Sequence, residues 1–141
     1  MLAALIVLLD IMRLEFFWKE FAGEIICFCK GVPSTENFLL EEMLTETMPI
    51  RPFSARREAD WRRGLIWEID EILHGESSEH IWQQERGCGA IDEISVTLSC
   101  NFGNGELVLD ILEFREVLVE FVEFLECGQS LKKTRITSIN I

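Results

Sequence analysis

Residues 105–126, GELVLDILEFREVLVEFVEFLE, decide the fold of this chain. At about 100° per residue on a helix, the apolar residues after Asp110 fall on one side and the glutamates fall on the other. The apolar side consists of Phe114, Val117, Leu118, Phe121, Val122, Phe124 and Leu125. The acidic side carries Glu113, Glu116, Glu120 and Glu123, and Glu126 extends it. The pattern predicts a helix with one buried face and one face of carboxylates.

The residues on either side of this helix predict strands. The run IDEISVTLS (91–99) alternates, NFGNG (101–105) is a turn sequence, and ELVLDIL follows with strand character, so residues 91–111 predict a hairpin. HIWQQER (80–86) predicts an earlier strand, and Gly87–Cys88–Gly89 reads as a turn before the next one. After Gly128 ends the helix, LKKTRITSINI predicts a final edge strand whose lysines discourage aggregation.

The N-terminal half predicts a hairpin followed by two helices. Residues 1–11 are either a helix or an N-terminal extension, a strand begins near Met12, and the turn Ala22–Gly23 leads to a second strand ending near Lys30. Ser34 or Thr35 is expected to cap a short helix that stops before Met48–Pro49 and whose apolar side is Phe38, Leu39, Met43 and Leu44. Ser54 is expected to cap a helix over residues 55–74, closed by Gly75, with the buried stripe Trp61, Leu65, Ile69, Ile72 and Leu73.

Helices therefore mix with hairpins instead of repeating strand–helix–strand units. This order predicts an α+β fold with a mainly antiparallel sheet and packed amphipathic helices. The 141 residues fit a single domain, 1–141, and 48% hydrophobic residues with ten Phe and four Trp supply a core.

The charge of the chain limits the classes of partner. A net charge of −12 disfavours nucleic acid and anionic membrane surfaces and favours a basic protein partner. The apolar run MLAALIVLL has no preceding positive charge and is interrupted by Asp10, so neither a signal peptide nor a membrane span is expected. Five cysteines without regular spacing argue against a disulfide scaffold and for a reducing cytoplasm.

The cysteines offer two candidate sites for chemistry. Cys27 and Cys29 point the same way on a strand and could hold a metal with His74 or His80, but buried free cysteines explain the pair better. Cys88 lies between glycines and could act as a nucleophile with either histidine as base, although Arg86 is the only local cation to activate it. Backbone geometry explains the glycines as well. We therefore expect no catalytic residue, no metal and no cofactor.

A group of arginines offers an alternative site. Arg51, Arg56, Arg57, Arg62 and Arg63 fall within thirteen positions, interleaved with Glu58 and Asp60. They could bind an anionic group of a small ligand or regulator, or they could form salt bridges inside the fold. The interleaved carboxylates favour salt bridges.

The stretch IDEISVTLSCNFGNGELVLDILEFREVLVEFVEFLE (91–126), in a small, acidic, cysteine-reduced chain, resembles the immunity proteins of bacterial polymorphic-toxin and contact-dependent inhibition systems. The resemblance implies a non-enzymatic protein that binds a cognate, often basic, toxin domain and blocks its active site, with a nuclease as one candidate target. It covers about a third of the chain and carries over no individual residue. On charge, the partner-binding residues are expected to be Glu113, Glu116, Glu120, Glu123 and Glu126.

Overall fold

The computed structural model describes residues 11–35, 38–45, 52–101 and 105–140, in which three helices pack with two antiparallel sheets. The first sheet has the order β2-β1-β7, from β1 (Ile11–Phe21), β2 (Glu24–Val32) and β7 (Thr134–Asn140). The second has the order β3-β4-β5-β6, from β3 (His80–Gln83), β4 (Gly87–Ile91), β5 (Ser95–Cys100) and β6 (Glu106–Asp110). The helices are α1 (Leu39–Thr45), α2 (Ala55–Leu73) and α3 (Ile111–Glu126). The predicted fold class is confirmed, with the strands divided between two sheets.

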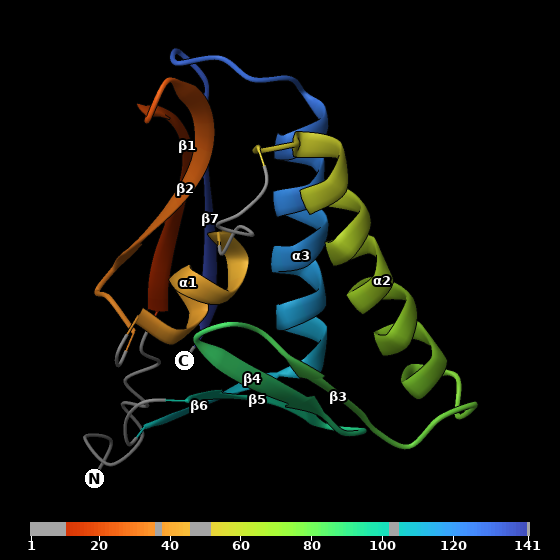
Figure 1. The fold of residues 1–141 in the computed structure, drawn as a ribbon. Coiled ribbons are helices and arrows are strands. Elements are labelled where there is room, and N and C mark those ends of the chain that lie inside the picture. The colour runs from red at the N-terminus through yellow and green to blue at the C-terminus, as the bar shows by residue number, and fades with distance from the viewer. Residues whose placement is uncertain (1–10, 36–37, 46–51, 102–104, 141) are drawn as a thin grey trace, which may run out of the picture.

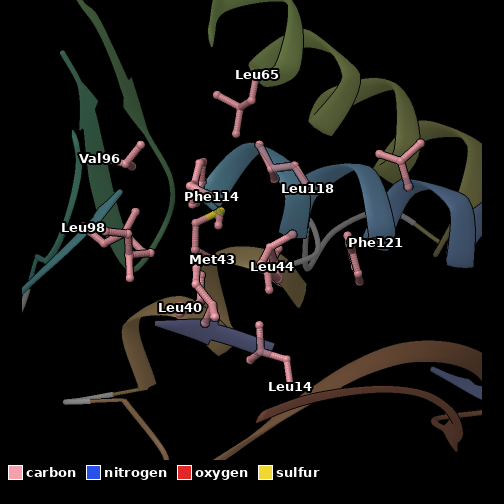
Figure 2. Packing of buried hydrophobic residues seen from close by; sticks show 14 of the residues in the cluster. Leu14, Leu40, Met43, Leu44, Leu65, Val96, Leu98, Phe114, Leu118 and Phe121 are labelled. Carbon is pink, nitrogen blue, oxygen red and sulfur yellow. The ribbon is translucent and has the colours of Figure 1, made fainter. Parts of the chain in front are cut away.

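Helix α3 lies at the centre of the molecule (Figure 1). The first sheet covers one side of it, α2 packs antiparallel on the other, and the second sheet crosses one end of both helices. The eight buried residues of α3 include all seven that the sequence placed on the apolar side of this helix. Figure 2 shows Phe114 and Leu118 between Leu65 of α2 and Met43 of α1. The amphipathic pattern of α3 thus places its glutamates on the solvent side.

The predicted N-terminal hairpin and C-terminal edge strand are confirmed. Ala22 and Gly23 have φ angles of 52° and 83°, as a tight two-residue turn between antiparallel strands requires. Strand β7 pairs with the other side of β1 and forms the edge of the sheet. Residues 1–10, on which the alternatives of a helix or an extension fall, lie outside the described residues.

The helix starts follow the expected capping chemistry. Thr35 Oγ1 accepts a hydrogen bond from the Leu40 N–H, so the side chain of Thr35, four residues before α1 begins, satisfies a donor in its first turn. Ser54 Oγ accepts from the Arg57 N–H, as predicted, and Gly75 follows the end of α2 with a φ of 76°. Helix α3 begins at a cap that the sequence analysis did not identify: the Asp110 carboxylate accepts from the next two free N–H groups of the helix.

The second sheet corrects two sequence predictions. Gly87–Cys88–Gly89 is not a turn but most of strand β4, and the turn before it lies at residues 84–86. The predicted strand over residues 91–99 is interrupted after Ile91, and β5 begins only at Ser95. The cause is Asp92, whose carboxylate accepts from the backbone N–H groups of Ile94 and Ser95 at 2.8 and 2.7 Å and closes a turn.

The buried stripe of α2 also differs from the prediction. Leu65, Ile69 and Ile72 are buried, but Trp61 and Leu73 are 37% and 40% exposed. The inner side of the first turns is formed instead by Glu58, Ala59 and Arg62. Charged side chains, Glu58 and Arg62, therefore occupy positions on the inner side of α2 where the helical period alone favours hydrophobic residues.

Candidate functional site

The five glutamates predicted to bind a partner form one continuous feature, the acidic strip, defined as Glu113, Glu116, Glu120, Glu123 and Glu126 of α3. One border of the strip is β7. The Glu113 carboxylate accepts from the backbone N–H and the side-chain amide of Asn140 at 3.2 and 2.7 Å. Glu120 and Glu123 both contact the guanidinium of Arg135, each at 2.9 Å. Three of the five side chains therefore also attach α3 to the edge strand.

The other border of the strip is α2. Glu126 forms an ion pair with Arg63, and Arg115 donates two hydrogen bonds to the Asp70 carboxylate at 2.7 and 3.1 Å. The hydrogen bonds from Arg115 lower the pKa of Asp70, and the same contact raises the pKa of the Arg115 guanidinium. These two pairs hold the helices in register along their solvent side.

The acidic strip remains anionic after these contacts. Among the described residues, Arg135 and Arg63 form ion pairs with it and Arg115 interacts electrostatically with Glu116, and three arginines cannot neutralise five carboxylates. Glu116 is exposed, and the side chains of Glu123 and Glu126 are 54% and 50% exposed. These three are the members most accessible to a partner.

A second group of carboxylates lies at the end of α2. Glu71 and Glu76 are hydrogen-bonded to each other, and this contact, together with the negative charges nearby, raises the pKa of Glu71. The carboxylates of Glu68 and Glu76 both act electrostatically on Glu71. The negative potential of the molecule thus extends beyond α3.

The arginine cluster does not converge on one site. Arg51 lies outside the described residues. Arg56 is almost fully exposed beside Asp60, Arg57 donates to the Pro52 carbonyl, and Arg63 turns towards Glu126. The salt-bridge interpretation accounts for the arginines that the structure describes.

Arg62 is the member of the cluster with the most unusual environment, since it is 1% exposed. It forms an ion pair with the buried Glu58, and its guanidinium lies 4.4 Å from the ring centre of Trp61 and 5.4 Å from that of Phe121. It also donates to the carbonyl oxygens of Met43 and Leu44. A cation there complements the negative end of the α1 dipole and satisfies carbonyls that the helix leaves free.

Cys27 and Cys29 are free cysteines on the helix-facing side of β2. Burial raises the pKa of Cys27 to about 12 and raises that of Cys29 as well, so both thiols stay protonated near neutral pH. Metal binding requires the thiolate. Among the residues described, no group of three or more His, Cys, Asp or Glu side chains is arranged to hold a metal ion.

Cys88 and His80 lie on opposite faces of the second sheet. Cys88 pairs with Gln83, whereas His80 alternates in phase with the buried Trp82 and stacks on its ring at 6.4 Å. His80 instead contacts Glu68 at 3.5 Å. Because the thiol and the imidazole lie on opposite faces, His80 cannot act as the general base for a nucleophilic Cys88.

Trp67 is an exposed aromatic residue that the sequence analysis did not select. It is 60% exposed on the solvent side of α2, between Arg63 and Asp70 in sequence, both of which form ion pairs with α3. Tryptophan is enriched among residues that dominate binding energy at protein interfaces. The signal was present in the sequence, because Trp67 lies outside the apolar stripe that defines the buried side of α2.

No helix in the described part of the chain is both long and apolar enough to cross a membrane. The resemblance to immunity proteins stays a prediction. Comparisons with protein-family models, with curated proteins and with solved structures found no match.

Proposed function

We propose that this chain is a non-enzymatic inhibitor of the immunity-protein type, which binds a basic toxin domain through the acidic strip of α3. The observation that carries the proposal is the geometry of the strip: five carboxylates on one helix, contacted by two arginines, with three of the carboxylates accessible. The negative electrostatic field of such a strip attracts a positively charged partner and increases the rate of association.

Two exposed apolar residues supply the contact area that charge alone does not. Leu112 is 59% exposed one residue before the strip, and Trp67 is 60% exposed on the neighbouring helix. Stable interfaces combine such apolar anchors with a polar rim. We propose that the carboxylates orient the toxin domain and that Leu112 and Trp67 slow its release.

The structure decides which substitutions test this proposal. Glu113, Glu120 and Glu123 contact β7, so changing them would disturb the edge strand as well as the charge. Glu116→Lys with Glu126→Lys reverses two exposed charges and leaves both contacts of Arg135 with the strip in place, while Glu126 gives up its ion pair with Arg63 of α2. The matched control is Glu93→Lys with Glu106→Lys, which makes the same charge change at exposed positions in the β4–β5 turn and on β6.

The resemblance implies that the toxin gene lies next to the gene for this chain, so the probe is the purified product of the adjacent reading frame. We expect tight binding whose association rate falls with added salt. The strip variant should associate at least about tenfold more slowly at low salt, while the control pair stays near the wild type. Equal rates for the two folded variants would reject the acidic strip as the binding surface, and no binding at any salt concentration would reject the toxin assignment.

A further inference from the structure

The three-stranded sheet has one face that no described element covers. Met12, Leu14, Phe16 and Trp18 of β1 point inwards and are buried against the helices. The alternate residues of β1 therefore point away from α1 and α3, which both lie on the inward side (Figure 1). This outward face is distinct from the acidic strip.

The outward face is rich in apolar side chains. Phe17 of β1 and Phe28 of β2 are directly opposed, with ring centres 6.0 Å apart and planes 22° from parallel. Around them Phe21 is 61%, Val32 52% and Ile136 53% exposed. An open sheet face of this composition is typical of an interaction surface.

Two opposite charges on this face lie at equal distances from Phe17 along β1. Along β1 the outward residues run Arg13, Glu15, Phe17, Lys19 and Phe21, so one carboxylate and one ammonium lie two residues to either side of the ring. A twofold axis that crosses the strands at Phe17 exchanges these two positions. The charge order is therefore self-complementary for two copies packed face to face, as an isologous contact requires.

We propose that a second copy of this chain docks on the outward face of the β2-β1-β7 sheet, with Phe17 and Phe28 at the twofold axis and Glu15 of each copy paired with Lys19 of the other. Two sheets packed in this way lie about 10 Å apart with strands nearly aligned, a separation that Glu and Lys side chains bridge. Each strand then lies over its own counterpart.

The overall charge favours this face over the rest of the surface for self-association. Two molecules of net charge −12 repel each other, and on the acidic strip or beside Glu71 the like charges would meet directly. On the outward face, Arg13, Lys19 and Lys30 lie among Glu15 and Glu24, and Glu15 is directly opposite Lys30 in the β1–β2 pairing, so charges of both signs are mixed there. A second copy is thus the occupant that fits both the apolar centre and the charge order.

Sedimentation equilibrium of the full chain tests the proposal through a charge swap. We expect a concentration-dependent dimer, and Glu15→Lys or Lys19→Glu alone should raise its dissociation constant at least about tenfold, because each creates two like-charge contacts across the axis. Combining both substitutions restores opposite charges and should recover most of the affinity. Residues 15 and 19 are about 13 Å apart along one strand, so pairing within a chain does not explain such a recovery.

The control is Glu79→Lys, an exposed position outside this sheet, which should leave the dimer unchanged. Circular dichroism spectra confirm that each variant is folded. A chain that stays monomeric at every concentration overturns the proposal. A dimer that neither single substitution weakens also overturns it, because its interface lies elsewhere. A double variant that does not recover the affinity of the wild-type dimer overturns it as well. Toxin binding is measured separately, so failure of the dimer leaves the proposed inhibitor function standing.

Discussion

Arg62 shows how one side chain connects three parts of the interior. It lies on α2, reaches the last carbonyls of α1, and is covered by the ring of Phe121 from α3. Its partner Glu58 is also buried. A buried ion pair is costly to desolvate, and the hydrogen bonds to the carbonyls of α1 offset part of that cost.

Removing Arg62 should therefore destabilise the protein strongly. Arg62→Leu leaves the buried Glu58 carboxylate with only the Arg57 guanidinium, 3.9 Å away, and frees the carbonyl of Leu44. We expect a loss of about 3–5 kcal/mol in the free energy of unfolding, measured by urea denaturation. Adding Glu58→Leu should recover part of the loss, because the pair is then removed as a unit.

Arg56→Leu is the matched control on the same helix, since its side chain is 93% exposed. Its effect should stay within about 0.5 kcal/mol. If Arg62→Leu were equally mild, Arg62 would not connect the helices in the way its contacts indicate.

At the scale of elements, strand β4 shows how a neighbouring ring selects a glycine. A Cβ placed on Gly89 would lie 2.1 Å from the ring of Trp82, and one on Gly87 would lie 2.6 Å from the Ser99 carbonyl oxygen. Both glycines let other groups approach the strand closely. The glycine-rich sequence thus reflects a contact across the sheet, not a turn.

Gly89→Ala should cost about 1–3 kcal/mol of unfolding free energy, because the methyl group displaces the buried Trp82 ring. A change in tryptophan fluorescence should accompany the loss. Gly64→Ala is the control on α2, where no atom lies within 4 Å of the new Cβ. It should stabilise the helix by up to about 1 kcal/mol. A neutral Gly89→Ala would contradict the packing of Trp82 on β4.

For the whole molecule, the position of α3 between a sheet and a helix determines what the acidic strip can do. Contacts with Arg135 on one side and Arg63 on the other fix the strip in place. The Arg115–Asp70 pair adds a second connection between α2 and α3. A rigid row of carboxylates loses little conformational entropy when a partner binds.

The Arg115–Asp70 pair gives the fold a predictable pH dependence. Because Arg115 lowers the folded pKa of Asp70, the ionised carboxylate stabilises the folded state. This contribution is complete above the ordinary aspartate pKa of about 4 and is lost as the pH falls from there through the lower folded pKa. Arg115→Gln removes it, so the stability difference between wild type and variant should shrink as the pH falls below about 4.

Urea denaturation of both proteins across that pH range measures the difference directly. Lys132→Gln, at an exposed position near the start of β7, is the control for loss of one positive charge. A difference that stays constant with pH for Arg115→Gln would show that Asp70 ionisation is not coupled to folding through this contact.

The sequence by itself determined the elements whose pattern is local. The period of α3, the Ala22–Gly23 turn and the Ser54 cap depend on residues a few positions apart, and the structure confirms each of them. The α+β class follows from the order of those elements. Local patterns of this kind are fixed by backbone sterics and by which side of an element must leave water.

Only the tertiary structure decided which charges face solvent and which hold the fold together. The sequence presents Arg62 and Arg63 as neighbours in one basic cluster, yet one is buried against Phe121 and the other reaches Glu126. In the same way, the row of glutamates on α3 looks uniform until β7 and α2 supply Arg135 and Arg63. The physical reason is that an ion pair depends on distance in space, and residues far apart in the chain meet only after the hydrophobic faces have packed.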